Sequence, residues 1–266
     1  MSLILTEKRG HVAILTLNRP EAMNALGAPG DGDQVAAACE AINDDQEIRC
    51  VILTGAGKAF SAGGDVKAMK AREGAFGGNG VKVRDGYRKN IHRIVRAIYG
   101  LEVPSIAAVN GAAIGIGTTM LLHCDFVYVA DESRLAMPFV ALGLVPEFAS
   151  SLTVPALVGQ RRAAELLLLG MPFNGEQAVE YGIANAVLPS KEVANHARRV
   201  AERFNALPPS GVRESKKLLR RVDDAKIREQ IETEAAIFGS RLRGPEAQEA
   251  FQAFFQKRQP DFSKFS

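Results

Sequence analysis

The sequence contains no tryptophan, only three cysteines and only four histidines among its 266 residues. The cysteines, Cys39, Cys50 and Cys124, are odd in number and lack the spacing of a metal site, which indicates reduced thiols rather than a disulfide framework. The histidines occur at unrelated places and form neither a Ser/His/Asp pattern nor a metal-binding pattern. We therefore expect no metal centre and no serine-type catalytic triad.

An excess of charge of one sign is also missing. The chain has 33 basic and 30 acidic residues and a net charge of +3, which is too balanced for a typical nucleic-acid-binding surface. No apolar run is long enough to span a membrane, and residues 1–10 lack the apolar centre of a secretion signal. We expect a cytoplasmic protein with no nucleic-acid or membrane partner, and with 47% hydrophobic residues to build one well-packed domain and a smaller appendage.

Two segments of the sequence share one design, in which a strand runs through a glycine-containing turn into a helix. In the first segment, the apolar run Val51–Leu53 predicts a buried strand, and Ser61–Gly64 leads into a helix that starts near Val66. Small residues let the backbone approach a ligand closely, and amide hydrogens at such a turn can bind an anion or an oxyanion. Asp65 is placed to cap the helix.

The second segment begins with a predicted strand at Ser105–Val109, turns at Asn110-Gly111, and passes through Gly115–Gly117 into a helix at Thr118–Leu122. Two amides from two such helix starts are what a developing thioester enolate needs. Either segment alone is weak support, because strand–turn–helix units occur in α/β proteins of many functions. The third glycine of a dinucleotide-binding fingerprint is absent, so no nicotinamide cofactor is indicated.

Taken together and in order, these segments resemble the crotonase superfamily, the enoyl-CoA hydratase/isomerase family. The resemblance extends over nearly the whole chain and rests on NRPEAMNAL at 18–26 and on the stretches at 58–65, 110–125 and 143–151. It implies an α/β fold in which strands and helices form a spiral of ββα turns. It also implies an acyl-CoA thioester as substrate, with CoA as part of the substrate rather than a cofactor.

The pattern changes along the chain, and we expect two regions. Residues 1–200 are expected to form the spiral core with the CoA and acyl site, and 201–266 a helical region that packs on the core or on a neighbouring subunit. The resemblance implies a homotrimer, or a dimer of trimers, formed through these helices. A glycine-rich loop at 74–80 beside the proposed site is either a lid or simply disordered.

The resemblance also indicates which residues bind the substrate. The amides at Ala62 and Ile116 are expected to form the oxyanion hole, although the family commonly has glycine at the second of these positions. The residues expected to contact the substrate or its CoA part are Ala25, Ala62, Gly63, Gly64, Asp65, Ile116 and Gly117. Asp65 is interpreted as a helix cap or a wall of the adenine pocket rather than as a catalytic group.

Hydration of an enoyl-CoA needs two carboxylates, one to activate water and one to deliver a proton. At the two positions where the family's hydratases have them, this sequence has Thr119 and Phe139, which disfavours a hydratase. One acid remains in the stretch at 143–151, namely Glu147. A Pro-Glu pair followed by small residues resembles the Δ3,Δ2-enoyl-CoA isomerase branch, although that branch usually has glycine where this chain has Phe148.

The resulting hypothesis is an isomerase that moves a double bond from C3 to C2 of an acyl-CoA, with Glu147 acting as base and then as acid. Two alternatives stay open at this point: another crotonase reaction such as enoyl-CoA hydration, or a non-catalytic acyl-CoA-binding subunit if Glu147 is a solvent-exposed acid following Pro146. An apolar lining from Phe139, Leu142 and Phe148 would raise the pKa of Glu147, whereas a helix start at that point would lower it.

Overall fold

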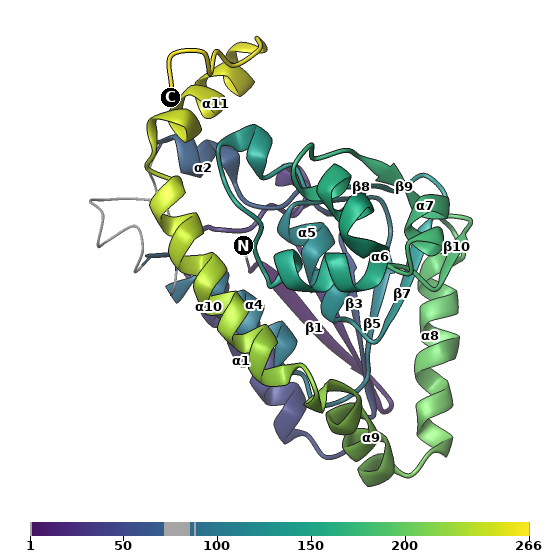
Figure 1. The fold of residues 1–266 in the computed structure, drawn as a ribbon. Helices are drawn as coiled ribbons and strands as arrows, with labels where there is room; N and C mark the ends of the chain where they lie inside the picture. The colour runs from purple at the N-terminus through teal and green to yellow at the C-terminus, as the bar shows by residue number, and fades with distance from the viewer. Residues whose placement is uncertain (1, 72–85, 88, 266) are drawn as a thin grey trace.

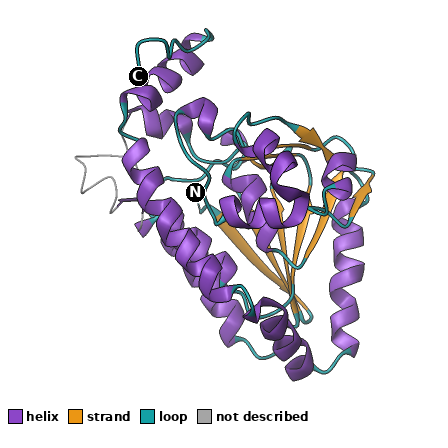
Figure 2. Cartoon of the chain, in the orientation of Figure 1, coloured by secondary structure: helices purple, strands orange, loops and turns teal. Residues whose placement is uncertain are grey.

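The computed structural model describes residues 2–71, 86–87 and 89–265, and Figures 1 and 2 show its mixed α/β architecture. The glycine-rich loop predicted at 74–80 lies outside the described residues. Within the described part of the chain, the strands form a six-stranded sheet in the order β1-β2-β3-β5-β7-β10 and a four-stranded sheet in the order β4-β6-β8-β9. The strands are β1 (Ile4–Arg9), β2 (Val12–Leu17), β3 (Cys50–Gly55), β4 (Ala59–Ser61), β5 (Ser105–Val109), β6 (Ala112–Ile114), β7 (Phe126–Ala130), β8 (Arg134–Ala136), β9 (Phe173–Asn174) and β10 (Ala186–Leu188).

The two sheets are linked by a repeated turn. The strands β3, β5 and β7 lie next to one another in the large sheet, and each is followed by a short strand of the small sheet, β4, β6 and β8. These neighbours pair in parallel in both sheets, and a helical segment follows each short strand before the chain returns. The spiral of ββα turns expected from the resemblance is therefore confirmed.

Helices surround the two sheets (Figure 2). They are α1 (Asp31–Asp44), α2 (Val66–Ala71), α4 (Ile91–Tyr99), α5 (Ile116–Thr119), α6 (Ser150–Leu167), α7 (Gly175–Glu180), α8 (Val193–Arg203), α9 (Pro209–Arg221), α10 (Asp224–Arg241) and α11 (Pro245–Gln256). Short 3-10 turns occur at η1 (Pro20–Ala22), η3 (Met120–His123), η4 (Val140–Leu142) and η5 (Phe204–Ala206). The segment 201–266 is helical as expected, whereas its separation from residues 1–200 as a distinct region stays a prediction.

The central strands of the large sheet, β2, β3, β5 and β7, are buried on both faces, which explains why they are almost continuously apolar. Along β3, Cys50 and Ile52 point to a cluster that includes Val193 and Ala197 of α8. The alternate residues, Val51 and Leu53, point to the main core on the opposite face. Figure 1 shows α8 on one side of the sheet and the long helix α10 on the other side of the molecule.

The helix α6 consists of two helical segments that meet at a kink. The sequence pattern predicts a helix at Arg161–Leu169, which corresponds to the second segment, and the structure adds a first segment that starts at Ser150. Gly159 has a non-helical conformation at the kink (φ 75°, ψ 159°), and Pro155 lies in the first segment. These two residue types usually mark a helix end, so they concealed the first segment, which directly follows Glu147.

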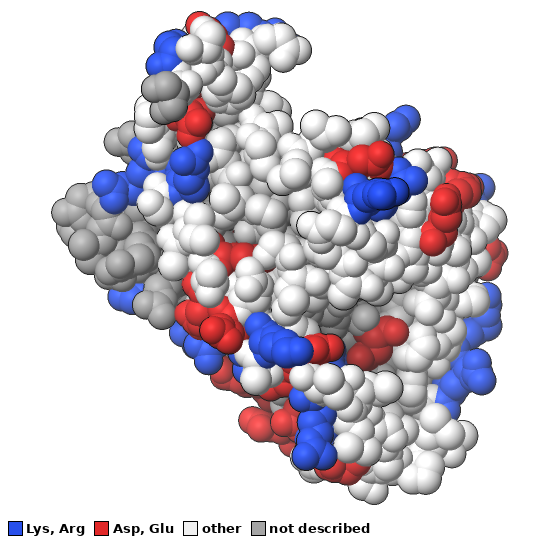
Figure 3. Space-filling view, in the orientation of Figure 1, with Lys and Arg blue, Asp and Glu red and all other residues white. Residues whose placement is uncertain are grey.

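Among the described residues, the structure has no helix with the length and apolar character needed to cross a membrane. On the face seen in Figure 3, basic and acidic side chains are interspersed. This distribution matches the balanced composition of the chain.

Candidate active site

A cavity of about 380 Å³ opens where the two glycine-containing segments meet the stretch before α6. Its walls come from the turn between β4 and α2, from the start of α5, and from α10 and α11. The described residues that line it are Ala62, Gly63, Gly64, Val66, Met69, Ile114, Gly115, Ile116, Pro138, Phe139, Ala141, Leu142, Leu144, Glu147, Phe238, Ala250, Phe254, Arg258 and Pro260. Most of these side chains are apolar, and only one is an acid.

That acid is Glu147, which is 5% exposed. Its carboxyl Oε2 accepts a hydrogen bond of 2.7 Å from the hydroxyl of Tyr87, a residue that is itself 2% exposed and lies shortly before α4. The solvent-exposed position that would have fitted a non-catalytic surface acid is thereby excluded. The helix expected to start at Pro146–Glu147 begins instead at Ser150, whose amide donates to the Glu147 carbonyl at 3.2 Å.

Burial raises the pKa of Glu147 from 4.5 to about 7. The largest cause is the loss of hydration in the apolar cavity, which disfavours the charged carboxylate. The hydrogen bond from Tyr87 acts in the opposite direction, and the nearby charge of Glu234 raises the pKa further. Of the two effects considered from the sequence, an apolar lining that raises the pKa and a helix start that lowers it, the apolar lining is therefore the larger. At neutral pH the Glu147 carboxyl group can both accept and return a proton.

The backbone directly after Glu147 is unusual. Phe148 (φ 61°) and Ala149 (φ 54°) both have left-handed conformations, although neither is glycine. Such conformations typically cost about 1–3 kcal/mol each and persist only where surrounding contacts enforce them. Phe148 is 2% exposed and Ala149 is fully buried. Phe148, which was expected to line the acyl site, thus packs inside the protein next to the cavity.

The expected oxyanion hole needs one correction. The Ala62 amide donates to the carbonyl of Met23 at 2.8 Å and is therefore not free to bind a substrate oxygen. The neighbouring bridge between Leu26 and Gly64 is closed by the Gly63 carbonyl and the Asp65 amide. Consequently the Gly64 amide has no hydrogen-bond partner among the described residues, and it lies on the cavity. In this run of small residues, the free amide at the cavity is thus that of Gly64, two residues after Ala62.

The second expected amide fits the geometry better. Ile116 begins α5 and lines the cavity. The amides at the first positions of a helix have no partner within the helix. In this turn Thr118 and Thr119 donate to the Gly115 carbonyl. The Ile116 amide makes no hydrogen bond within the described residues, so it is available beside Gly64.

The remaining predicted contact residues divide into two groups. Gly63 lines the cavity, whereas Asp65 caps α2 by accepting from the Lys67 and Ala68 amides. Ala25 is 8% exposed, and its carbonyl is bound by Arg19. At Gly117 a Cβ atom would lie 2.6 Å from the Ser61 carbonyl oxygen, so glycine there permits close packing of α5 on β4. The cavity lining does not include Ala25, Asp65 or Gly117.

The two positions at which the family's hydratases have carboxylates are both buried. Phe139 lies on the cavity wall, with its ring centroid 6.5 Å from that of Phe238. Thr119 is fully buried, and its hydroxyl has no partner in the described structure. Among the described residues, the cavity therefore presents one carboxyl group, whereas hydration needs two. The described residues also contain no cluster of His, Cys, Asp or Glu that would hold a metal ion.

Sequence reasoning missed two residues around Glu147. The helical spacing of apolar residues within 85–100 predicts only that Tyr87 belongs to a buried helix face. A buried tyrosine hydroxyl usually has a hydrogen-bond partner, which was a usable signal. Glu234 on α10 is 4% exposed and accepts from the Ser151 amide at 2.9 Å and from its hydroxyl. An acid on the inner face of a helix was its only sequence signal.

Comparison with known proteins agrees with this geometry. Residues 7–264 match the family model described as enoyl-CoA hydratase/isomerase. The chain is 34% identical to a crotonyl-CoA hydratase of Syntrophomonas wolfei, with 97% of each chain covered. It is 31% identical to the 1,2-epoxyphenylacetyl-CoA isomerase of Escherichia coli, with 99% of each covered.

Solved structures give the same result. The structure of Pseudomonas aeruginosa OdaA superimposes with a TM-score of 0.86 at 42% identity, covering 96% of this chain and 99% of that one. An enoyl-CoA hydratase/isomerase from Pseudoalteromonas atlantica superimposes with a TM-score of 0.86 at 36% identity, covering 98% and 99%. This chain therefore belongs to the enoyl-CoA hydratase/isomerase family, which is the crotonase superfamily.

Proposed function

We propose that this enzyme is an acyl-CoA isomerase that moves a double bond from C3 to C2, with Glu147 as its single acid–base group. The observation that carries the proposal is the buried carboxyl of Glu147, the one acid among the described residues of an apolar cavity. A double-bond shift consumes no water and needs one group to carry one proton. A hydration would need a second carboxylate, and Thr119 and Phe139 stand at the positions expected for it.

The proposed reaction has two steps. The Glu147 carboxylate removes a proton from C2 of the 3-enoyl thioester, and the electrons move into a dienolate whose negative charge lies largely on the thioester oxygen. The amides of Gly64 and Ile116 stabilise that oxygen. The Glu147 carboxyl group then returns the proton to C4, which places the double bond between C2 and C3 in conjugation with the carbonyl.

Tyr87 supports this cycle by orienting the carboxyl group. Its hydroxyl donates to Oε2 at 2.7 Å, so Oε1 is the oxygen left to take and return the proton. A fixed carboxyl group can serve both C2 and C4, because the two carbons lie close together in a planar fragment.

Relatives of this chain are named both as hydratases and as isomerases. The Syntrophomonas wolfei protein is named a crotonyl-CoA hydratase, and the Escherichia coli protein a 1,2-epoxyphenylacetyl-CoA isomerase. We infer an acyl-CoA thioester as the substrate class for this chain, because the family model covers almost its whole length. The choice of isomerisation over hydration rests on the carboxyl groups of this chain.

The direct test offers 3-enoyl-CoA esters of several chain lengths to the wild type and to Glu147→Gln, and follows the conjugated 2-enoyl thioester by its absorbance. The wild type should form it, and the variant should bind the ester but lose about 10²–10⁴-fold or more in kcat, the usual effect of removing a positioned base. Glu165→Gln, which changes an exposed acid on α6, serves as the control.

An undiminished Glu147→Gln variant would remove Glu147 from the mechanism. A wild type that is inert toward every 3-enoyl-CoA would contradict the proposed isomerase. Rapid addition of water to a 2-enoyl-CoA would identify the enzyme as a hydratase instead.

A further inference from the structure

The turn that carries Glu147 is held by a residue that lies outside the cavity lining. His123, at the end of η3, is 5% exposed and makes a 2.6 Å hydrogen bond through Nε2 to the Phe148 carbonyl oxygen. Because a carbonyl oxygen only accepts hydrogen bonds, Nε2 carries the proton and donates. The bond therefore reaches the residue directly after Glu147.

A second contact joins the same two residues. The rings of His123 and Phe148 stack with their centroids 4.3 Å apart and an interplanar angle of 21°. The side chain and the carbonyl of Phe148 are thus both held by one imidazole. This contact accounts for a non-glycine residue at a position with φ 61°, because the native turn is enforced from outside the turn itself.

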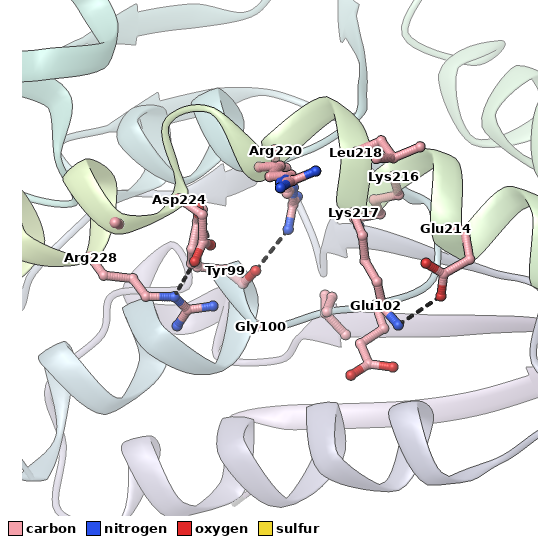
Figure 4. Close-up of a pocket in the computed structure, with 13 residues that line it drawn as sticks. Tyr99, Gly100, Glu102, Glu214, Lys216, Lys217, Leu218, Arg220, Asp224 and Arg228 are labelled. Carbon is pink, nitrogen blue, oxygen red and sulfur yellow. Dashed lines mark hydrogen bonds and ion pairs between the residues drawn. The ribbon is translucent and has the colours of Figure 1, made fainter.

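His123 is in turn fixed by the C-terminal helices. Arg220 of α9 donates to the His123 carbonyl oxygen at 2.8 Å and to the Tyr99 carbonyl oxygen at 2.8 Å. The Tyr99 ring meets the imidazole edge-on, with centroids 5.3 Å apart. Figure 4 shows Arg220 reaching down toward Tyr99 from α9. Burial lowers the pKa of His123 to about 4, so the ring is neutral at physiological pH and keeps one donor.

We propose that His123 is a positioning residue for the isomerisation, which holds the Phe148 carbonyl and thereby keeps the Glu147 carboxyl group on the cavity. This inference rests on the proposed function of Glu147 and adds the device that orients it. We call the His123 imidazole, with its two contacts to Phe148, the imidazole clamp. In this chain the clamp enforces a left-handed turn that a glycine would adopt without such contacts. A glycine would adopt this turn without steric strain but would leave the backbone more flexible, whereas the clamp holds the turn in one conformation.

The test compares His123→Gln, whose side-chain amide can donate to the same carbonyl, with His123→Leu, which fills similar space without a donor. Asn43→Leu is the control, because Asn43 donates to the Gly100 carbonyl at 3.0 Å, a similar bond outside the cavity lining. Two quantities are measured: kcat and KM for a 3-enoyl-CoA, and the pKa of Glu147 followed by infrared difference spectroscopy against Glu147→Gln.

For His123→Leu we expect kcat to fall by about 10- to 100-fold with KM within about twofold, since a displacement near 1 Å can cost about 10² in rate. The pKa of Glu147 should fall from about 7 as the carboxyl group becomes better hydrated. His123→Gln should recover most of the rate and the raised pKa. Asn43→Leu should change the stability of the protein but neither of these values.

A His123→Leu variant with wild-type kcat, or a His123→Gln variant as impaired as His123→Leu, would overturn the proposal. An equal loss of kcat in Asn43→Leu would also overturn it by showing a general effect of stability. If the wild type does not act on 3-enoyl-CoA, the proposed function fails. The pKa of Glu147, compared between the wild type and the His123 variants, still tests whether His123 positions the carboxyl group. An unchanged Glu147 pKa in His123→Leu would then refute it.

Discussion

At the scale of single residues, two neighbours act on the Glu147 carboxyl group in opposite directions. The hydrogen bond from Tyr87 favours its charged form, whereas the buried carboxyl of Glu234 disfavours it. Neither residue was identified as part of the site from the sequence. Both were brought to Glu147 by tertiary folding, Tyr87 from just before α4 and Glu234 from α10.

This opposition predicts opposite shifts in the pH dependence of the enzyme. Glu147 must be ionised to accept a proton, so kcat/KM should rise with pH through about 7 in the wild type. In Tyr87→Phe the midpoint of the pH profile should move to higher pH, because the Glu147 carboxylate loses a hydrogen bond that stabilises its charged form. In Glu234→Gln it should move to lower pH, because a negative charge is removed.

The measurement is the pH profile of kcat/KM for a 3-enoyl-CoA in all three proteins. Shifts in the same direction for both variants would contradict this account of the electrostatics. So would a wild-type profile that is flat between about pH 5 and 9, since a single base with a pKa near 7 must titrate in that range.

At the scale of elements, α9 is fastened to the sheet by a buried lysine. Lys216 is 6% exposed, and its Nζ donates to the Val103 carbonyl at 2.6 Å and to Asp125 at 2.7 Å. Asp125 also accepts from the Ser105 amide at 2.7 Å, at the start of β5. The sequence of α9 favours a solvated basic face, with contact to a CoA phosphate as the second interpretation, but Lys216 of that face is buried in the structure.

Lys216 and Lys217 both line an exposed cavity of about 570 Å³, which Figure 4 shows. The pairs formed by the exposed side chains of this cavity differ from the buried contacts of Lys216. Four of the cavity's charged side chains form two exposed pairs, Lys217 with Glu214 and Arg228 with Asp224.

Replacing Lys216 by methionine should lower the free energy of unfolding by roughly 3 kcal/mol, because it leaves a partly buried carboxylate without its closest cation. The matched variant Lys217→Met loses only an exposed pair, so its free energy of unfolding should stay close to that of the wild type. Urea unfolding at pH 7 measures both. Equal stabilities for the two variants would show that Lys216 does not fasten α9.

Sequence reasoning succeeded for elements with local signals and failed where the signal was distant. The strands at Val51–Leu53 and Ser105–Val109 and the helix at Val66 follow from local patterns, and the structure contains them. The register within Ser61–Gly64 did not follow, because small residues look alike until the bridge to Leu26 decides which amide is free. The bond from Tyr87 to Glu147 spans 60 positions and has no local signal.

At the scale of the whole molecule, the spiral places the two glycine-containing turns side by side and lets the C-terminal helices complete the cavity. The helix α11 packs on α2 and η4, and supplies Ala250 and Phe254 to the cavity wall. The predicted division at residue 200 therefore crosses a site to which both parts contribute. The expected homotrimer, or dimer of trimers, stays a prediction.

A group of apolar side chains at the C-terminal end of α9 and directly after it gives that prediction a test. Leu218, Leu219 and Val222 are 63%, 85% and 78% exposed, which is unusual for neighbouring large apolar residues. We expect light scattering to show a trimer or hexamer for the wild type and smaller species for Leu219→Glu. Leu157→Glu, an exposed site on α6, should leave the assembly intact. A monomeric wild type would contradict the expected oligomer.

The most direct measurement for the whole account follows the migrating proton. A 3-enoyl-CoA labelled with deuterium at C2 is converted in ordinary water under single-turnover conditions, and the product is examined by mass spectrometry and NMR. If one buried carboxyl group moves the proton, a measurable fraction of the deuterium removed from C2 will appear at C4. A C4 hydrogen that comes entirely from solvent in the first turnover would contradict a mechanism in which Glu147 alone carries it.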